Sequence, residues 1–323
     1  MKVVMGAGGN ERMPGEKEFF IELKNLFPNV TFEFADTVEL QKNAIQDADV
    51  FYGWPVSEVF NAANRLRWVH IPATGIEHIS EIPELVASNV ILTNSRVHHA
   101  PPMADHVIGM MLILAHRWKQ LIADQKNHKW EDLKYYENQE GLQGRTVGIV
   151  SFGDIGMHVA QRAHSFGMNV YAVDKHEKLP SPYVQEIWSM DKLDDLLRIS
   201  DWLIITSPLT SETAGLIDQD KLAILKDGAC VIVISRGGIV NEKALIDNLK
   251  SGHVRGAGFD AMEKEPLDVD SPLWDMDNVV ITPHISSAIS EMFEGRRQIF
   301  RDNLKRFLAS EQLLFVCDKE SGY

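Results

Sequence analysis

Short apolar runs alternate with amphipathic segments along nearly the whole chain, and this alternation restricts the possible folds more than any other feature. Runs that are apolar throughout predict strands buried on both faces, which form parallel sheets covered by helices. The predicted strands are residues 2–5, 49–53, 67–71, 146–152, 169–174, 201–207, 229–235, 254–260 and 278–282. The predicted helices between them include residues 16–27, 157–167, 190–200 and 242–252. The pattern therefore indicates an α/β protein.

The alternation falls into two blocks, one before about residue 98 and one after about residue 145. The segment between the blocks begins with Pro101 and Pro102, which suit the first turn of a helix, and continues with mostly apolar residues. We interpret it as one long helix that connects two domains. The length of 323 residues is sufficient for two domains that each have their own core.

The charge balance and the cysteine content restrict the partners and the compartment. A net charge of −14 disfavours nucleic-acid or anionic-membrane partners, because both select for clustered lysine and arginine. Cys230 and Cys317 are the only cysteines, so the sequence offers no disulfide framework. The longest apolar stretch, 106–116, is too short to span a membrane, and the first 16 residues lack the features of a signal or transit peptide. We expect a cytoplasmic protein.

The stretch GIVSFGDIG, residues 148–156, resembles the glycine-rich turn that binds a dinucleotide after the first strand of a Rossmann fold. Gly153 and Gly156 occupy the second and third glycine positions, whereas Ser151 occupies the first. Asp174 ends the next strand 21 residues after Gly153, the spacing at which a carboxylate reaches the adenosine ribose. The predicted cofactor-binding turn comprises Ser151, Phe152, Gly153, Asp154, Ile155 and Gly156.

Three questions about the dinucleotide site stay open. The first is the cost of Ser151, because serine replaces glycine at modest cost only where the backbone has an ordinary β or bridge conformation. The carboxylate of Asp174 would repel a 2′-phosphate and favour NAD, but Lys175 and His176 follow it, so NADP stays an alternative. The sequence GAGG at 6–9 is a rival phosphate loop, although Glu11 stands at its third glycine position.

Polar residues that suit 2-oxo acid chemistry follow three successive predicted strands. Arg236 follows the strand at 229–235, Asp260 and Glu265 follow the next, and His284 follows the last. Open α/β sheets bind ligands at the carboxyl ends of their strands. There an arginine would hold a carboxylate and polarise a carbonyl, and a histidine would deliver a proton. Taken singly, each side chain also fits a surface ion pair or an ordinary hydrogen bond.

Other polar and aromatic residues allow weaker interpretations. His98 and His99 are adjacent and belong to no metal-binding spacing, so we expect no metal site. Tyr52 and Trp54 end a predicted strand and fit either a substrate pocket or aromatic core packing. Trp130 and the apolar residues of 103–121 fit dimer or domain packing.

Four stretches together resemble the D-2-hydroxyacid dehydrogenase family: GLQGRTVGIVSFGDIGMHVAQRAHSFGMNVYAVD, SRGGIVNEKAL, GAGFDAMEKEPL and TPHISS. The C-terminal sequence resembles one branch of that family, so the similarity covers essentially the whole chain. The resemblance implies two Rossmann-like domains with parallel sheets, usually in a homodimer. Residues 1–98 and 287–323 would form a flavodoxin-like substrate domain, and residues 99–286 the NAD-binding Rossmann domain.

The resemblance also implies a role for each matching residue. Arg236 would bind the substrate carboxylate and carbonyl, His284 would be the general acid/base, and Glu265 would hydrogen-bond the histidine. The backbone amides of Ala73, Thr74 and Gly75 would bind the substrate carboxylate. Asp260 would orient the nicotinamide carboxamide. Further expected cofactor contacts are Asp174, Lys175, Ser207, Pro208, Thr213 and Ser235.

The implied function is reduction of a 2-oxo acid to its D-2-hydroxy acid with NADH. Glu265 argues against formate dehydrogenase activity, and Thr74 argues against phosphite dehydrogenase activity, because those relatives carry other residues there. A dinucleotide-sensing protein without turnover, similar to corepressors of the same fold, is the alternative function. The identity of the 2-oxo acid stays open. Asn241 replaces a common aspartate of the family, and we expect it to cap a helix.

Overall fold

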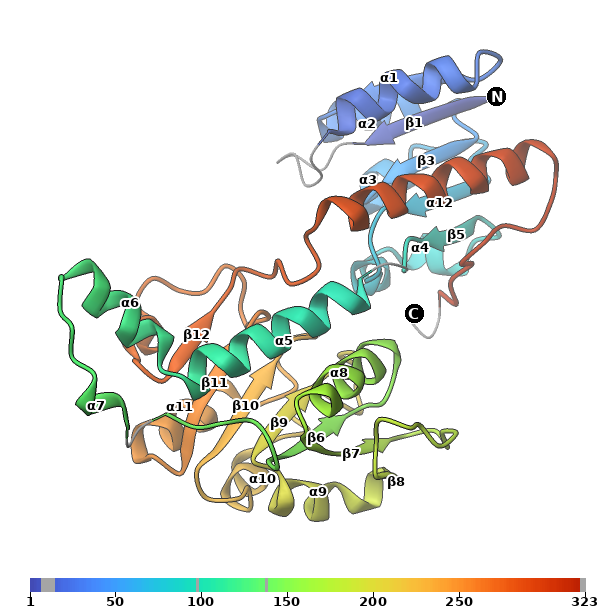
Figure 1. Cartoon of the computed structure of the whole chain (residues 1–323). Coiled ribbons are helices and arrows are strands. Elements are labelled where there is room, and N and C mark those ends of the chain that lie inside the picture. The colour runs from blue at the N-terminus through green and yellow to red at the C-terminus, as the bar shows by residue number, and fades with distance from the viewer. Residues whose placement is uncertain (7–14, 97–98, 137–138, 320–323) are drawn as a thin grey trace. The chain divides into compact units, whose positions relative to one another are not determined.

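The computed structural model describes residues 1–6, 15–96, 99–136 and 139–319 (Figure 1). The rival loop sequence at 7–9, Glu11 and His98 lie outside these described residues. The chain divides into two compact units. Unit 1 is Met1–His98 with Ala288–Tyr323, and unit 2 is His99–Ser287.

Unit 1 contains a parallel sheet with the strand order β2-β1-β3-β4-β5, which is the flavodoxin-like order. Its strands are β1 (Lys2–Gly6), β2 (Thr31–Ala35), β3 (Val50–Gly53), β4 (Trp68–Ile71) and β5 (Ile91–Asn94). Alternate residues of β1, β3 and β4 enter opposite cores, so two separate apolar clusters form. Helices α1 (Glu16–Leu26) and α12 (Ser290–Leu308) cover one face. Helices α2 (Val38–Ile45), α3 (Ser57–Phe60), α4 (Pro83–Ala87) and the 3-10 helix η1 (Glu77–Glu81) cover the other.

The C-terminal part of the chain completes unit 1. Figure 1 shows α12 running along the sheet of this unit. After α12 the chain returns to the β5 edge, where Val316 forms an antiparallel bridge with Thr93. The Cys317 N–H donates to the Leu92 carbonyl at 2.9 Å, so the tail extends the sheet by a short antiparallel segment.

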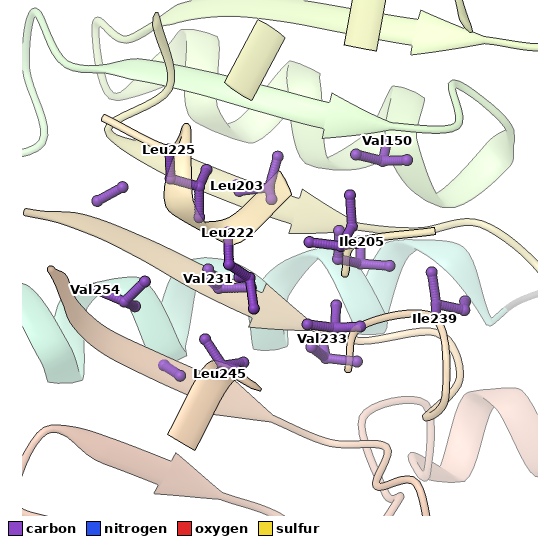
Figure 2. Close-up of a cluster of buried hydrophobic side chains, with 14 of the residues drawn as sticks. Val150, Leu203, Ile205, Leu222, Leu225, Val231, Val233, Ile239, Leu245 and Val254 are labelled. Atoms are coloured by element: carbon purple, nitrogen blue, oxygen red, sulfur yellow. The ribbon is translucent and has the colours of Figure 1, made fainter. Parts of the chain in front are cut away.

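Unit 2 contains a seven-stranded parallel sheet with the order β12-β11-β10-β9-β6-β7-β8, the Rossmann order with one added edge strand. Its strands are β6 (Thr146–Val150), β7 (Asn169–Asp174), β8 (Glu186–Ser189), β9 (Trp202–Ile205), β10 (Ala229–Val233), β11 (Val254–Phe259) and β12 (Val279–Ile281). The adjacent helices α5 (Ala100–Ala115) and α8 (Asp154–Ser165) cover one face. Helices α9 (Leu193–Ile199), α10 (Gln219–Ala223) and α11 (Glu242–Ser251) cover the other, whose core is drawn in Figure 2. The 3-10 helices are η2 (Met190–Lys192) and η3 (Pro272–Asp275).

These sheets confirm the predicted α/β fold with one flavodoxin-like and one Rossmann sheet. The prediction of one long connecting helix was wrong. The backbone of Arg117 is left-handed, with φ 56°, and it separates α5 from α6 (Trp118–Lys126). A short α7 (Leu133–Tyr136) follows. No proline or glycine marks this break in the sequence. Among the described residues, no helix is long and apolar enough to span a membrane.

Candidate active site

The glycine-rich turn lies between β6 and α8, at the point where the strand order of unit 2 reverses. At Gly153 a Cβ atom would meet nothing within 4 Å, so the backbone there is open to a ligand. At Gly156 a Cβ would lie 2.7 Å from the Ser151 carbonyl oxygen, which explains why only glycine fits. The turn therefore leads into the N-terminus of α8, where backbone N–H groups and the helix dipole favour a phosphate.

Ser151 does not meet the condition under which serine replaces glycine at modest cost. Its φ is 76°, in the left-handed region that favours glycine. Hydrogen bonds hold this conformation, because the Ser151 N–H donates to Val173 and the Thr206 hydroxyl donates to the Ser151 carbonyl at 2.6 Å. Sequence reasoning missed Thr206, whose hydroxyl also lies 3.0 Å from the Val150 carbonyl.

Asp174 ends β7 as predicted and is 7% exposed. Its Oδ2 accepts the Phe152 N–H at 2.7 Å, and its Oδ1 accepts the His176 N–H at 2.8 Å. Lys178 Nζ lies 3.4 Å from Oδ1. Lys175, the neighbouring predicted contact, forms an exposed ion pair of 2.5 Å with Glu212. The carboxylate thus connects the end of β7 to the glycine-rich turn.

The segment after β9 lies beside this turn, because β9 pairs with β6. The Ser207 side chain is fully buried, and its Oγ has no hydrogen-bond partner among the described residues. The Thr213 hydroxyl donates to the Pro208 carbonyl at 2.6 Å and closes the following loop. Ser235 is also buried and donates to the Ile205 carbonyl at 3.2 Å. An open glycine, a helix N-terminus and an unpartnered buried hydroxyl fit a dinucleotide.

The residues Glu265 and His284 meet after β11 and β12. His284 Nδ1 lies 2.9 Å from Glu265 Oε2, and both side chains are 42% exposed. Glu265 Oε1 also accepts the Met262 N–H at 3.0 Å, which fixes the carboxylate in its loop. A carboxylate at Nδ1 leaves Nε2 as the imidazole atom that can exchange a proton with a ligand. His284 has a left-handed backbone with φ 55°.

Arg236 follows β10 and lies next to a closely packed pair of loops. Its Nη1 donates to the Ser235 carbonyl at 2.8 Å. The neighbouring Gly237 packs so closely that a Cβ would collide with the Met262 carbonyl. This contact joins the loop of Arg236 to the loop that carries Glu265. The predicted helix cap is confirmed, because the Asn241 side chain accepts the Ala244 N–H at 2.8 Å.

Asp260 directly follows β11 and is 1% exposed. Its Oδ1 accepts the Thr282 hydroxyl at 2.6 Å and the Ile285 N–H at 2.9 Å. Its Oδ2 accepts the Ser286 N–H at 3.0 Å. The carboxylate therefore holds the loop on both sides of His284, a function that the sequence reasoning missed. Its expected role beside the nicotinamide stays a prediction.

Unit 1 contains the residues expected at the substrate. The Ala73 carbonyl accepts the Ser95 N–H at 2.9 Å, and the Thr74 carbonyl accepts Asn94 Nδ2 at 2.7 Å. These bonds fix the loop that continues to Gly75 after β4. Sequence reasoning missed Asn94, which gave no motif signal.

The two aromatic residues after β3 have different surroundings. Tyr52 is 2% exposed and stacks on His70, with 5.7 Å between ring centroids, so it belongs to the core. Trp54 is partly buried and packs against the apolar cluster on the opposite face of the unit 1 sheet. Within the described part of the chain, no group of three His, Cys, Asp or Glu side chains could hold a metal ion.

A Rossmann sheet with a glycine-rich turn, joined to a histidine–carboxylate pair on the same strand ends, defines a dinucleotide-binding α/β protein. Residues 108–286 match the model of the D-isomer specific 2-hydroxyacid dehydrogenase NAD-binding domain. The chain belongs to the D-isomer specific 2-hydroxyacid dehydrogenase family. Its dinucleotide cofactor is accordingly NAD(P).

Two curated relatives and one solved structure illustrate the similarity. The glyoxylate reductase of Thermococcus kodakarensis is 33% identical over 270 residues, which are 82% of this chain and 80% of that protein. The D-3-phosphoglycerate dehydrogenase of Mycobacterium bovis is 33% identical over 255 residues, which are 79% of this chain. This chain spans about half of that relative, 47% of its length. An NADPH-dependent glyoxylate/hydroxypyruvate reductase from Sinorhizobium meliloti, solved with NADP and sulfate, aligns with a TM-score of 0.84 and 26% identity. That alignment covers 100% of this chain and 99% of the solved one.

Proposed function

We propose that the protein is a cytoplasmic oxidoreductase that reduces a 2-oxo acid to the D-2-hydroxy acid with NADH. The observation that carries the proposal is the 2.9 Å contact between His284 Nδ1 and Glu265, in the same unit as a glycine-rich dinucleotide turn. The names of the relatives, a glyoxylate reductase and a phosphoglycerate dehydrogenase, support this reaction class. The two cysteines are free and buried, which fits a reducing compartment.

The dinucleotide would lie on the turn 151–156, on Ser207 and beside Asp174. When bound in reduced form, it supplies the hydride that reaches the carbonyl carbon. Asp174 carries a negative charge at the end of β7, and a cofactor with two free ribose hydroxyls suits it better than one with a 2′-phosphate. The proposal is therefore NAD, with Lys175 and His176 as the residues that would favour NADP.

The chain's own residues supply binding and proton transfer. Arg236 binds the carboxylate of the 2-oxo acid and polarises its carbonyl. In unit 1, the backbone N–H groups of Ala73, Thr74 and Gly75 are the proposed donors to a substrate carboxylate. His284 delivers a proton from Nε2 to the carbonyl oxygen, and Glu265 stabilises the charged imidazole that holds this proton. In the reverse direction Nε2 takes the proton from the hydroxyl group.

The test is the loss of NADH and NADPH fluorescence with a panel of 2-oxo acids from glyoxylate to phenylpyruvate. We expect turnover with NADH, and a decrease in kcat of at least about a hundredfold in His284→Gln, the scale of general acid catalysis. His164→Gln removes an exposed histidine of α8 and is the matched control. Tight NADH binding without turnover of any acid would contradict the proposal, and a preference for NADPH would contradict the assignment of NAD.

The proposal includes a homodimer. The arm, residues 118–136, carries several large apolar side chains that face solvent in the single chain. They are Trp118 (51% exposed), Ile122 (46%), Trp130 (95%), Leu133 (75%) and Tyr136 (73%). Such a concentration of exposed aromatic and aliphatic groups is typical of protein–protein interfaces. A second copy of the chain would bury these side chains.

A further inference from the structure

His106 lies on α5, outside every motif that identified the site, and it contacts the loop that carries His284. Its Nε2 is 2.9 Å from the Thr282 hydroxyl oxygen and 4.0 Å from Asp260 Oδ1. All of these residues belong to unit 2. The side chain of His106 is only 24% exposed, so this contact is largely shielded from water.

The direction of each hydrogen bond follows from the chemistry of the groups. An ionised carboxylate only accepts, so the Thr282 hydroxyl donates its single hydrogen to Asp260 Oδ1 at 2.6 Å. The same oxygen must then accept from His106, whose Nε2 therefore carries a hydrogen. The result is a series of hydrogen bonds in which His106 donates to Thr282 and Thr282 donates to Asp260.

The end of this series is the backbone around His284. Asp260 accepts the N–H groups of Ile285 and Ser286 at 2.9 and 3.0 Å. His284 itself has a φ of 55°, a conformation that a non-glycine residue keeps only where its surroundings enforce it. The hydrogen bonds to Thr282, Ile285 and Ser286 bracket that residue and provide the enforcement.

We propose that His106 is a positioning residue for His284 and acts through Thr282 and Asp260. The proposal rests on the function proposed above, in which His284 is the proton donor. Without the His106 donor, the Thr282 hydroxyl is free to turn from Asp260 toward the Phe259 carbonyl, 3.5 Å away. The buried carboxylate then loses a partner, and the His284 loop loses one of its anchors.

The kinetic test compares variants that remove or keep the donor. In His106→Leu we expect kcat for 2-oxo acid reduction to fall about tenfold while KM for NADH and for the acid stays within about twofold, the scale of one lost hydrogen bond to a charged group. His106→Gln keeps an N–H at a similar reach and should restore most of the activity. Thr282→Val should match His106→Leu, and the double variant should be no worse than either single one, because both break one series of hydrogen bonds.

A second readout does not depend on turnover. The amides of Ile285 and Ser286 donate to Asp260, so their hydrogen–deuterium exchange reports the anchor directly. We expect both amides to exchange about tenfold faster in His106→Leu than in the wild-type chain, and near the wild-type rate in His106→Gln. His116→Leu removes the other α5 histidine, at the C-cap, and should change neither exchange nor kcat.

Three results would overturn the proposal: unchanged exchange in His106→Leu, equal effects in His116→Leu, or no recovery in His106→Gln. The exchange measurement separates this proposal from the proposed function. A wild-type chain that reduces no 2-oxo acid would refute the function, whereas faster exchange at Ile285 and Ser286 in His106→Leu would still support the anchoring role of His106.

Discussion

At the scale of single residues, two polar residues of the candidate active site have backbone conformations that glycine prefers. Ser151 has φ 76° in the dinucleotide turn, and His284 has φ 55° at the proposed proton donor. Such conformations cost about 1–3 kcal/mol each and cluster at functional sites. His284 must keep its imidazole, so its strain is inseparable from its role. Ser151 need not keep its side chain, because its backbone N–H and carbonyl make the hydrogen bonds to Val173 and Thr206.

Ser151→Gly is therefore expected to stabilise the protein. Relief of the left-handed strain outweighs the added entropy of the unfolded chain, so the free energy of unfolding should rise by about 0.5–1 kcal/mol. Urea unfolding followed by fluorescence measures it. Ser165→Gly, in the last turn of α8, is the control and should lower the same quantity, because glycine disfavours helix. A decrease in Ser151→Gly would show that the serine side chain stabilises the turn.

His70 makes the stability of unit 1 depend on pH. Complete burial between the hydroxyls of Thr93 and Ser95 lowers the pKa of this imidazole from 6.5 to about 3. Between these values the unfolded state binds a proton that the folded state does not. The stabilising contribution is present above pH 6.5 and is lost as the pH falls toward 3.

This histidine should account for about 2 kcal/mol of lost stability between pH 7.5 and pH 5. The measurement is urea unfolding of the wild-type chain and of His70→Gln at both pH values. The variant is expected to be less stable at pH 7.5 and to lose less stability on acidification, because glutamine does not titrate. Parallel pH profiles for the two proteins would refute the assignment to His70.

At the scale of elements, single side chains fasten segments that are distant in sequence. Lys319 in the tail donates through Nζ to the carbonyls of Leu85, Ser88 and Val90, at 3.0, 2.5 and 3.1 Å. These carbonyls belong to the end of α4 and to the approach to β5. The ammonium group thus satisfies three acceptors at once and fixes the tail beside the edge strand.

Lys319→Met should loosen this connection. Three carbonyls lose a charged donor while the alkyl packing of the side chain is kept, so we expect the free energy of unfolding to decrease by about 1–2 kcal/mol. Differential scanning calorimetry measures the change. Lys305→Met is the control, because this lysine of α12 is exposed and its side chain makes, among the described residues, a 3.7 Å ion pair with Asp302. Equal losses in the two variants would refute the role of Lys319.

At the scale of the whole molecule, the proposed homodimer would bury the apolar side chains of the arm. Light scattering coupled to size-exclusion chromatography should give the mass of a dimer, twice 36.4 kDa. Leu133→Asp combined with Trp130→Asp places two charges on the apolar surface and should shift the mass to that of a monomer. Leu179→Asp also changes a highly exposed leucine, outside the arm, and should leave the dimer intact. A monomeric wild-type chain would refute the homodimer.

The sequence also predicted most of the architecture. Continuous apolar runs revealed nine strands, because a strand buried on both faces has no polar alternation. The three missed strands, β2, β5 and β8, all lie at sheet edges. β2 alternates polar and apolar residues, and β8 has no buried residue, so neither shows a continuous apolar run. The helix break at Arg117 was not predictable, because arginine has no preference for the left-handed backbone found there.

The sequence alone predicted nine of the strands, the glycine-rich turn and the identities of the proposed catalytic residues, because these depend on local periodicity and on motifs contiguous in the chain. Only the tertiary structure decided which distant groups meet. It revealed the left-handed backbones of Ser151 and His284, and it placed His106 beside Thr282, 176 positions away. Such contacts depend on how helices pack on the sheet, and a single sequence carries no local signal of them.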